Sequence, residues 1–310
     1  MLWKEASLLV EESENEQIAA VTNLFSFVDL DAPKNASTKM LYDLPTVPGP
    51  TRFQKWLLLA SINILSRFRD RTGSALMLTS DLCVKYGGRL DIVEAQTMLF
   101  IAKSTSVPVP RTHFAFTHEE CTYILMERIH GQPAARNWVY RSDTSKSNIH
   151  DSLSKMVFEL RSLVPQSNAI CSASGGSLYD PRLLCTTRRF GPFKDDQEFH
   201  DFLRDGTQAQ SGDSDDFSKL TSLHAQNWGA PVFTHGDLSS LNILVRGDTI
   251  VGIIDWETAG WYPPYWEYTT ACQVNPQNSF WKDEINKFLE PIPVALVMEQ
   301  LRQRYFGDAF

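Results

Sequence analysis

The segment 233–255 restricts the fold of this chain more than any other part of the sequence. Two apolar runs, 242–245 and 249–254, flank the tripeptide Arg-Gly-Asp. Short apolar runs around a glycine turn are typical of a β-hairpin. Because the two strands of a hairpin run antiparallel, we expect Asn242 at the start of the first strand to lie beside Asp255 at the end of the second.

Asp237 belongs to the same end of the predicted hairpin, because it precedes the first strand by only a few positions. Carboxylate and amide oxygens that meet at one point suit Mg²⁺, a hard cation that takes one or two protein ligands and shares its other positions with phosphates and water. The alternative is that Asp237 caps a turn, while Asn242 and Asp255 only flank the strands. The spacing His-x-Asp-x4-Asn, followed by a hairpin and an aspartate, is rare enough by chance to favour the metal site.

Composition excludes several classes of protein. The 310 residues are 43% hydrophobic and 21% charged, which is typical of a globular chain with room for two lobes. Lys and Arg number 29 against 37 Asp and Glu, so the formal net charge is −8 and neither nucleic acid nor an anionic membrane is an expected partner. The 5 cysteines form no C-x-x-C pair, and no cationic segment precedes an apolar run at the N-terminus. We therefore expect a cytoplasmic protein without a disulfide framework.

The first part of the chain predicts helices followed by short strands. Helices are expected at 3–28 and 52–69, with a proline-bearing linker between them. Two short strands are expected, at 75–78 and 82–86, and a helix that Asp91 caps should then continue to Lys103. Further elements are predicted along the rest of the chain: a strand at 123–127, a helix at about 148–163 and a loop at 206–216.

The hairpin region carries a resemblance to a known superfamily. The run His-Gly-Asp-Leu-Ser-Ser-Leu-Asn-Ile-Leu-Val at 235–245 and the run Ile-Ile-Asp-Trp-Glu at 253–257 resemble the aminoglycoside phosphotransferases and choline kinases. The aromatic run 261–268 and the patch 191–202 are similar to fungal-type members, and the resemblance covers about 82–268. It implies an α+β, bilobal, protein-kinase-like fold with a small sheet-containing N-lobe and a larger, mostly helical C-lobe.

The resemblance also implies roles for the residues at the hairpin. Asp237, in the catalytic loop 235–242, would accept the proton of the attacking hydroxyl. Asn242 and Asp255 would hold Mg²⁺ against the phosphates of ATP or GTP. His235 would orient the loop rather than react. The protein-kinase loop H-R-D-L-x-x-x-N matches this run except at its second position, where the chain has glycine.

A second set of residues would bind the nucleotide. Lys85 is the candidate ligand of the α- and β-phosphates, and Glu94 on the next helix is its expected partner. Met126 would line the adenine pocket, and backbone groups of Glu127 and Ile129 would bind the base. Taken alone, the lysine and the glutamate read more simply as solvated charges, and the match around the hairpin is what favours the pair.

The expected domains are an N-terminal extension and linker at 1–50, an N-lobe at 51–129 that includes the hinge at 126–129, and a C-lobe at 130–310. No G-x-G-x-x-G precedes Lys85, and the only candidates for a phosphate-covering turn are at 73–75 and 78–81. This departure from the kinase pattern puts the affinity for a nucleotide in question.

These patterns predict a Mg²⁺-dependent phosphotransferase that moves the γ-phosphate of ATP or GTP to a hydroxyl of a small molecule. A protein kinase is disfavoured, because only about seven residues separate Asp255 from the Pro-Pro-Tyr-Trp-Glu run, too few for an activation segment. A third hypothesis is a pseudokinase-like regulator that binds a nucleotide, or a kinase fold repurposed for other chemistry in metabolism. The weak glycine loop favours it, and the intact Asp237, Asn242 and Asp255 oppose it.

The acceptor is less well defined by the sequence. Aromatic residues that follow the hairpin would either contact an apolar ring or an amine, or build the core of the C-lobe; they are Trp256, Trp261, Tyr262, Tyr265 and Trp266. The acidic residues between 195 and 216 would attract a cationic acceptor, but they read more simply as a solvated face. A cationic, hydroxyl-bearing acceptor is therefore a weak hypothesis, and the sequence names neither the acceptor nor the oligomeric state.

Overall fold

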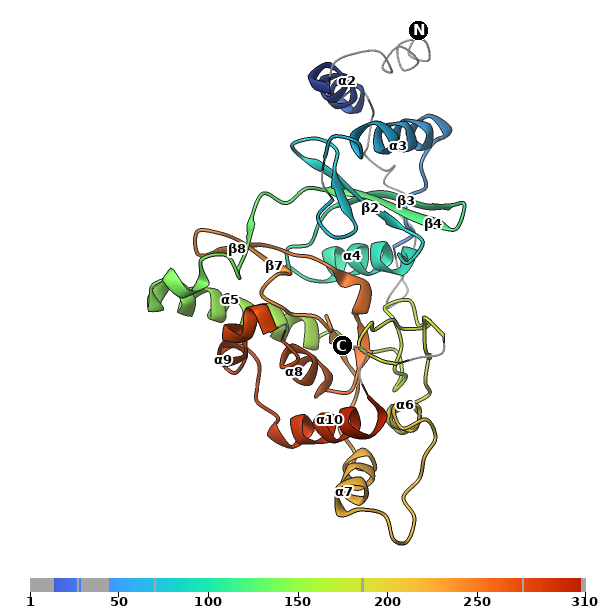
Figure 1. Ribbon diagram of the computed structural model, residues 1–310, viewed down its shortest axis with the longest axis vertical. Coiled ribbons are helices and arrows are strands. Elements are labelled where there is room, and N and C mark those ends of the chain that lie inside the picture. The colour runs from blue at the N-terminus through green and yellow to red at the C-terminus, as the bar shows by residue number, and fades with distance from the viewer. Residues whose placement is uncertain are drawn as a thin grey trace. The chain divides into compact units, whose positions relative to one another are not determined.

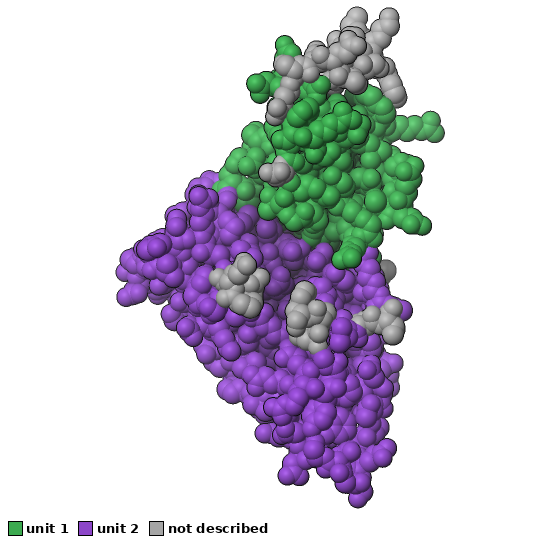
Figure 2. All heavy atoms as spheres, viewed as in Figure 1, with its two compact units in different colours: residues 1–99, 110–130 green, residues 100–109, 131–310 purple. Residues whose placement is uncertain are grey.

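The computed structural model describes residues 14–26, 28, 45–69, 71–184, 187–274 and 276–307. The chain forms two compact units, one made of 1–99 and 110–130 and the other of 100–109 and 131–310, which Figure 2 draws in green and purple. The predicted helix at 3–28 lies partly outside the described residues, as does most of the predicted linker. Within the described ranges no helix is long and apolar enough to cross a membrane.

The first unit contains a four-stranded antiparallel sheet. Its strands are β1 (Ala75–Met77), β2 (Leu82–Gly87), β3 (Thr112–His118) and β4 (Cys121–Glu127), in the order β1-β2-β4-β3. Lys85 pairs with Ile124 across β2 and β4, so the lysine stands on a central strand of the sheet. Strands β1, β2 and β4 lie where the sequence predicts them, whereas β3 was not predicted.

Three helices accompany this sheet: α2 (Glu14–Ser26), α3 (Arg52–Leu65) and α4 (Ile92–Ser104), all labelled in Figure 1. A capping box starts α3, since the Thr51 hydroxyl accepts the N–H of Gln54 and the Gln54 side chain accepts the N–H of Thr51. Asp91 begins α4 as predicted, because its Oδ1 accepts the N–H of Val93 at 2.9 Å. Apolar residues of α2 and α3 form one core cluster with the sheet.

The second unit contains the predicted hairpin. Its strands are β7 (Ile243–Arg246) and β8 (Thr249–Ile253), and β5 (Gln132–Pro133) adds to β7 in a three-stranded sheet. A separate pair joins β6 (Val232–Thr234) to β9 (Gly260–Tyr262). The Arg-Gly-Asp tripeptide makes the turn, with Gly247 at a φ of +60°.

Helices make up most of the rest of the second unit. They are α5 (Asp143–Arg161), α6 (Asp196–Leu203), α7 (Asp215–His224), α8 (Trp266–Ala271), α9 (Lys282–Ile285) and α10 (Pro293–Phe306), with 3₁₀ turns η1 (Trp138–Tyr140), η2 (Trp256–Thr258) and η3 (Pro276–Trp281). The aromatic residues after the hairpin are buried here: Tyr262 and Trp266 stack with ring centroids 5.4 Å apart. Their role is therefore to build this core, and the hypothesis that they bind an acceptor is wrong.

The acidic residues between 195 and 216 serve local structure at both ends of the run. The side chain of Asp195 caps α6 by accepting the N–H of Glu198 at 3.0 Å. Asp215 and Asp216 occupy the first turn of α7, where negative charge is favourable. Most of the acidic residues between them are exposed, as expected for a solvated face; they are Glu198, Asp201, Asp205 and Asp213. The fold is thus α+β, with an antiparallel sheet first and a mainly helical region after it.

Candidate functional site

The end of the hairpin brings the three predicted oxygen-bearing side chains together. The backbone N–H of Ile254 donates to the carbonyl of Asn242 at 2.9 Å, which places Asn242 next to the residue that precedes Asp255. The Asn242 amide Nδ2 donates to the Asp237 carboxylate Oδ2 at 2.7 Å and to the Asp237 carbonyl at 3.0 Å. The antiparallel geometry of the strands accounts for this arrangement.

Asp237 has the electrostatic character of a proton acceptor. Burial raises the pKa of its carboxyl group above the ordinary value, and the neighbouring Asp255 carboxylate raises it further. The guanidinium of Arg182 and the hydrogen bond from Asn242 act in the opposite direction. The pKa is raised on balance, and a carboxylate with a raised pKa is a stronger base.

Arg182 is a site residue that sequence reasoning missed. Its Nε and Nη2 donate to the two carboxylate oxygens of Asp180 at 2.8 and 2.6 Å, and Nη2 also donates to the carbonyl of Gly236 in the loop 235–242. Burial alone would lower the pKa of Arg182, but the Asp180 carboxylate raises it on balance, so the guanidinium stays charged. The contact between Arg182 and Gly236 joins segments that are far apart in the sequence, so no local sequence pattern predicts it.

His235 holds the loop 235–242 as an uncharged ring. Its Nδ1 accepts the backbone N–H of Asp237 at 3.1 Å, so Nε2 carries the proton and donates to the carbonyl of Ile254, also at 3.1 Å. Burial lowers the pKa of His235, which favours this neutral form. The ring thus connects the loop to the end of β8, in keeping with the orienting role expected for it.

Glu267 is a second residue near Asp237 whose contacts the sequence did not predict. From α8 its two carboxylate oxygens accept the backbone N–H groups of His235 at 2.6 Å and of Gly236 at 3.1 Å. The side chain is buried, and burial raises the pKa of its carboxyl group. The sequence showed Glu267 only as part of an aromatic run, without a sign that it fixes the loop.

Gly236 explains why the loop departs from the protein-kinase pattern at its second position. The residue has a φ of +82°, where side chains other than glycine are strained. A Cβ at this position would also stand 3.0 Å from the carbonyl oxygen of Thr258. An arginine could not take this backbone conformation without moving the loop, and Arg182 approaches the same loop from another segment.

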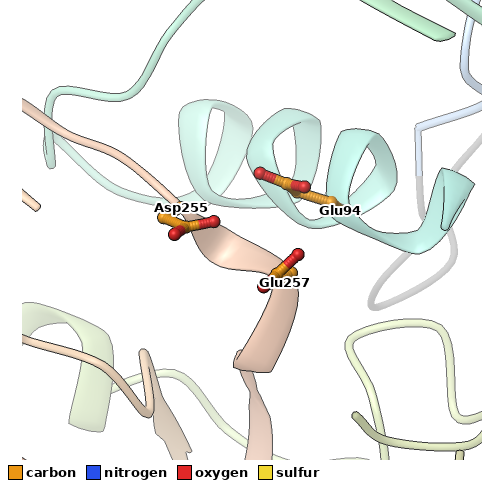
Figure 3. A group of neighbouring side chains, drawn as sticks. All are labelled: Glu94, Asp255 and Glu257. Atoms are coloured by element: carbon orange, nitrogen blue, oxygen red, sulfur yellow. The ribbon is translucent and has the colours of Figure 1, made fainter. Parts of the chain in front are cut away.

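The residues after β8 fit a hard cation. Figure 3 shows Asp255 and Glu257 on the chain that follows β8, and Glu94 on α4 of the first unit. Carboxylate oxygens of Asp255 and Glu257 come within 4.8 Å of each other, and Asp255 has a φ of +68°. Because Nδ2 of Asn242 is bound to Asp237, Oδ1 is the atom of that amide left for a metal ion. Carboxylate and amide oxygens are ligands that suit Mg²⁺.

A cavity of about 600 Å³ adjoins these residues within the second unit. Asp237, Asp255 and Arg182 line it, together with the segment after α8, η3 and α10. Of the five aromatic residues proposed to bind an acceptor, none is among the described residues that line it. The aromatic residue on its wall is instead Trp281, whose Nε1 donates to the carbonyl of Leu238 at 3.2 Å.

In the first unit, Lys85 and Glu94 form a buried ion pair. The Lys85 Nζ lies 2.9 and 2.8 Å from the two carboxylate oxygens of Glu94. The exposed fractions of the two residues are 7% and 2%, so the simpler reading of two solvated charges is wrong. A buried, bidentate pair fixes the lysine on its strand, while its expected role toward a nucleotide stays a prediction.

The predicted hinge lies at the end of β4. Met126 is buried and pairs with Cys83 of β2. The backbone N–H of Glu127 already donates to the carbonyl of Arg111 at 2.9 Å, so the carbonyl of Glu127 is the group to consider as a partner of a nucleotide base.

The turn 78–81, one candidate for the phosphate-covering turn, joins β1 to β2. The N–H groups of Leu78 and Thr79 donate to the carbonyl of Leu82.

Known structures share this fold. The chain is similar to the aminoglycoside phosphotransferase APH(4)-Ia, with 13% identity, 82% of this chain and 90% of that chain covered, and a TM-score of 0.53. A thermostable mutant of that protein, in ternary complex with AMP-PNP and hygromycin B, matches with 14% identity, coverage of 79% and 90%, and a TM-score of 0.53. At such low identity the likeness shows the fold alone, and no curated protein matches the chain.

The comparison with protein families shows the family of the chain, whereas the comparison with structures shows only its fold. The model of the phosphotransferase enzyme family matches residues 93–299, which is more than half of the chain. The matched region contains the loop 235–242, the hairpin and the buried Glu267. This chain therefore belongs to the phosphotransferase enzyme family.

Proposed function

We propose that the chain is a Mg²⁺-dependent phosphotransferase that moves the γ-phosphate of ATP or GTP to a hydroxyl group of a small molecule. The observation that carries the proposal is the group of Asp237, Asn242 and Asp255 at one end of one hairpin, beside a cavity of about 600 Å³. A base, metal ligands and a space for an acceptor are the parts that phosphoryl transfer requires.

In this proposal Asp237 takes the proton of the acceptor hydroxyl as the hydroxyl oxygen bonds to the γ-phosphorus. The bond between that phosphorus and the oxygen bridging it to the β-phosphate breaks, so that ADP or GDP leaves. Asn242 and Asp255 would hold Mg²⁺, which when bound neutralises charge on the phosphates. Arg182 and His235 keep the loop that carries Asp237 in place.

The first unit would supply the contacts to the nucleotide. Lys85 would bind the α- and β-phosphates, and Glu94 would hold the lysine in the geometry that the ion pair has now. The base would contact Met126 and the backbone at Glu127 and Ile129. The expected N-lobe at 51–129 and C-lobe at 130–310 are proposed as the functional division of the chain. The ternary complex of a thermostable APH(4)-Ia mutant with AMP-PNP and hygromycin B supports a nucleotide with a small-molecule acceptor.

The experiment that tests the proposal is phosphate transfer from Mg·ATP to a panel of hydroxyl compounds, followed by mass spectrometry of the products. Asp237→Asn should lower kcat by about a hundredfold to ten-thousandfold, the usual contribution of a general base, with the KM for Mg·ATP little changed. Asp248→Asn makes the same chemical change at the exposed turn of the hairpin, where the carboxylate contacts Arg141 and Ser145 and does not line the cavity, and should retain full activity. Equal activity of wild type and Asp237→Asn would refute the assigned base.

The regulatory alternative predicts a different result. It is favoured by the short turn at 78–81, which has no glycine to approach phosphates closely. Under that alternative, Mg·ATP would bind and no compound in the panel would receive phosphate. Binding without transfer would therefore favour a pseudokinase-like role over the proposed enzyme.

A further inference from the structure

The cavity beside Asp237 has walls of two different kinds. Its carboxylates, Asp237, Asp255 and Glu257, all come from the catalytic loop and the chain just after β8. These are the groups that the proposed function uses for the proton and the cation. The opposite wall comes from the end of α8, the residues after it, η3 and α10.

Among the described residues that line the cavity, this second wall carries no charge. The sequence from Tyr268 to Trp281 contains no Asp, Glu, Lys, Arg or His. Gln303 of α10, which also lines the cavity, is an uncharged amide. The one cationic side chain among the described lining residues, Arg182, is already bound bidentately by Asp180.

Apolar and hydrogen-bonding groups alternate on this side of the cavity. Trp281 and Val274 are apolar, while Gln273 and Asn278 carry amides, and Nε2 of Gln273 already donates to Glu299 at 3.2 Å. Mixed walls of this kind suit a ligand with one apolar face and several hydroxyl groups. An amine placed against them would lose water without gaining a counter-charge, which is costly.

Ser240 adds an independent observation. It lines the cavity from the catalytic loop, is 1% exposed, and its hydroxyl has no hydrogen-bond partner among the described residues. Buried hydroxyl groups in native proteins are nearly always satisfied, so an unpaired one at a cavity wall indicates a partner supplied from outside.

We infer that the acceptor is an uncharged, hydroxyl-bearing compound with an apolar face, such as a glycoside with an apolar aglycone, and that Ser240 hydrogen-bonds to it. The inference rests on the proposed function, since it names the class of molecule that would receive the phosphate. The acceptor oxygen would lie at Asp237, and the apolar face would lie against the charge-free wall.

A matched pair of acceptors tests the inference directly. Phenyl β-D-glucopyranoside and its analogue with an amine in place of the 2-hydroxyl differ in one group, and each is offered to the enzyme with Mg·ATP. We expect kcat/KM for the neutral glycoside to exceed that of the amine by at least about tenfold, the effect of one uncompensated charge. Preference for the amine would overturn the inference, and so would the absence of transfer to either compound while Mg·ATP still binds.

Variants of the wall separate this inference from the proposed function. Val274→Asp adds a carboxylate to the charge-free wall and should shift the preference about tenfold toward the amine. Val274→Asn matches the aspartate in size and polarity without its charge and should cause no such shift. Ser240→Ala should raise the KM for the neutral glycoside and leave the KM for Mg·ATP unchanged. If wild type does not bind Mg·ATP, the proposed function itself is wrong. If the two Val274 variants have the same preference between the neutral glycoside and the amine, only the acceptor class is refuted.

Discussion

At the scale of a single residue, Gly236 sets the conformation of the loop 235–242. Its backbone has a φ of +82°, and its Cα faces the carbonyl oxygen of Thr258 so closely that an added Cβ would stand 3.0 Å away. Its N–H donates to Glu267 and its carbonyl accepts from Arg182. Any shift of this residue would therefore also move Asp237, which follows it.

Gly236→Ala is expected to cost both stability and activity. The free energy of unfolding should fall by about 2–4 kcal/mol, because the change adds left-handed backbone strain to a close contact in a packed region. Urea unfolding measures this loss, and kcat should fall with it. Gly247→Ala is the matched control: its φ is +60°, nothing lies within 4 Å of the added Cβ, and only about 1 kcal/mol of strain is expected. Similar losses for both variants would show that the Thr258 contact is unimportant.

The sequence predicted those site residues that are related by local geometry. One hairpin brings together Asp237, Asn242 and Asp255. A hairpin can be predicted from sequence because its two apolar strands flank a glycine turn. Arg182 and Glu267 reach the same loop from distant segments, and contacts over such separations leave no periodic pattern in a single sequence. The roles of the residues come from the resemblance and from chemistry, not from periodicity.

At the scale of elements, α6 and α7 meet through a buried pair of histidines. The rings of His200 and His224 stack with centroids 4.5 Å apart. Arg204 donates to Nδ1 of His224 at 2.6 Å, and the Tyr265 hydroxyl lies 2.6 Å from Nε2 of His200. Burial lowers the pKa of His200 to about 4 and, together with the charge of Arg204, keeps His224 neutral as well.

This pair predicts a loss of stability in mild acid. An unfolded histidine binds its proton below pH about 6.5, whereas folded His200 does so only below about 4. Between these values the unfolded state holds more protons, so the stabilisation present above pH 6.5 is lost as the pH falls toward 4. Each histidine changes the free energy of unfolding by at most about 1.4 kcal/mol per pH unit in this range.

Urea unfolding between pH 4 and 8 measures this slope. His224→Gln keeps an acceptor for Arg204 but cannot titrate, so the dependence of the unfolding free energy on pH should become flatter. The same replacement at His130, which is exposed, removes a surface ion pair with Asp81; this variant is the control and should change the dependence far less. An unchanged slope in His224→Gln would mean that the buried pair does not govern stability in acid.

The sequence did not predict strands β3, β5, β6 and β9 or helices α6 to α10, and for β3 and α8 the lack of a clear period is the physical reason. Strand β3 stands at the edge of its sheet, and its sequence mixes Thr and His with apolar residues, so its alternation is weak. Helix α8 is buried on every side. A helix without a polar face has no amphipathic pattern from which it could be predicted. Helix α5 begins at Asp143, earlier than the predicted 148, because Ser142 caps it by accepting the N–H of Ser145.

At the scale of the whole molecule, binding of a nucleotide should be visible as a change in thermal stability. A ligand at a hundred times its Kd adds about 2.7 kcal/mol to the stability of the folded state. For a chain of this length that free energy corresponds to a rise in Tm of about 4 °C. We therefore expect millimolar Mg·ATP or Mg·GTP to raise the Tm of wild type, and the larger rise to identify the preferred nucleotide.

Asp255→Ala and Asp237→Asn distinguish metal binding from catalysis in this experiment. Removal of the Asp255 carboxylate takes charge from the expected Mg²⁺ ligands, so the rise in Tm should shrink or vanish. Asp237→Asn should keep the rise, because the base acts on the acceptor rather than on the nucleotide. ATP without Mg²⁺ is the control for nonspecific effects. A full rise in Asp255→Ala would contradict its assignment as a metal ligand, and the absence of any rise in wild type would contradict nucleotide use by this chain.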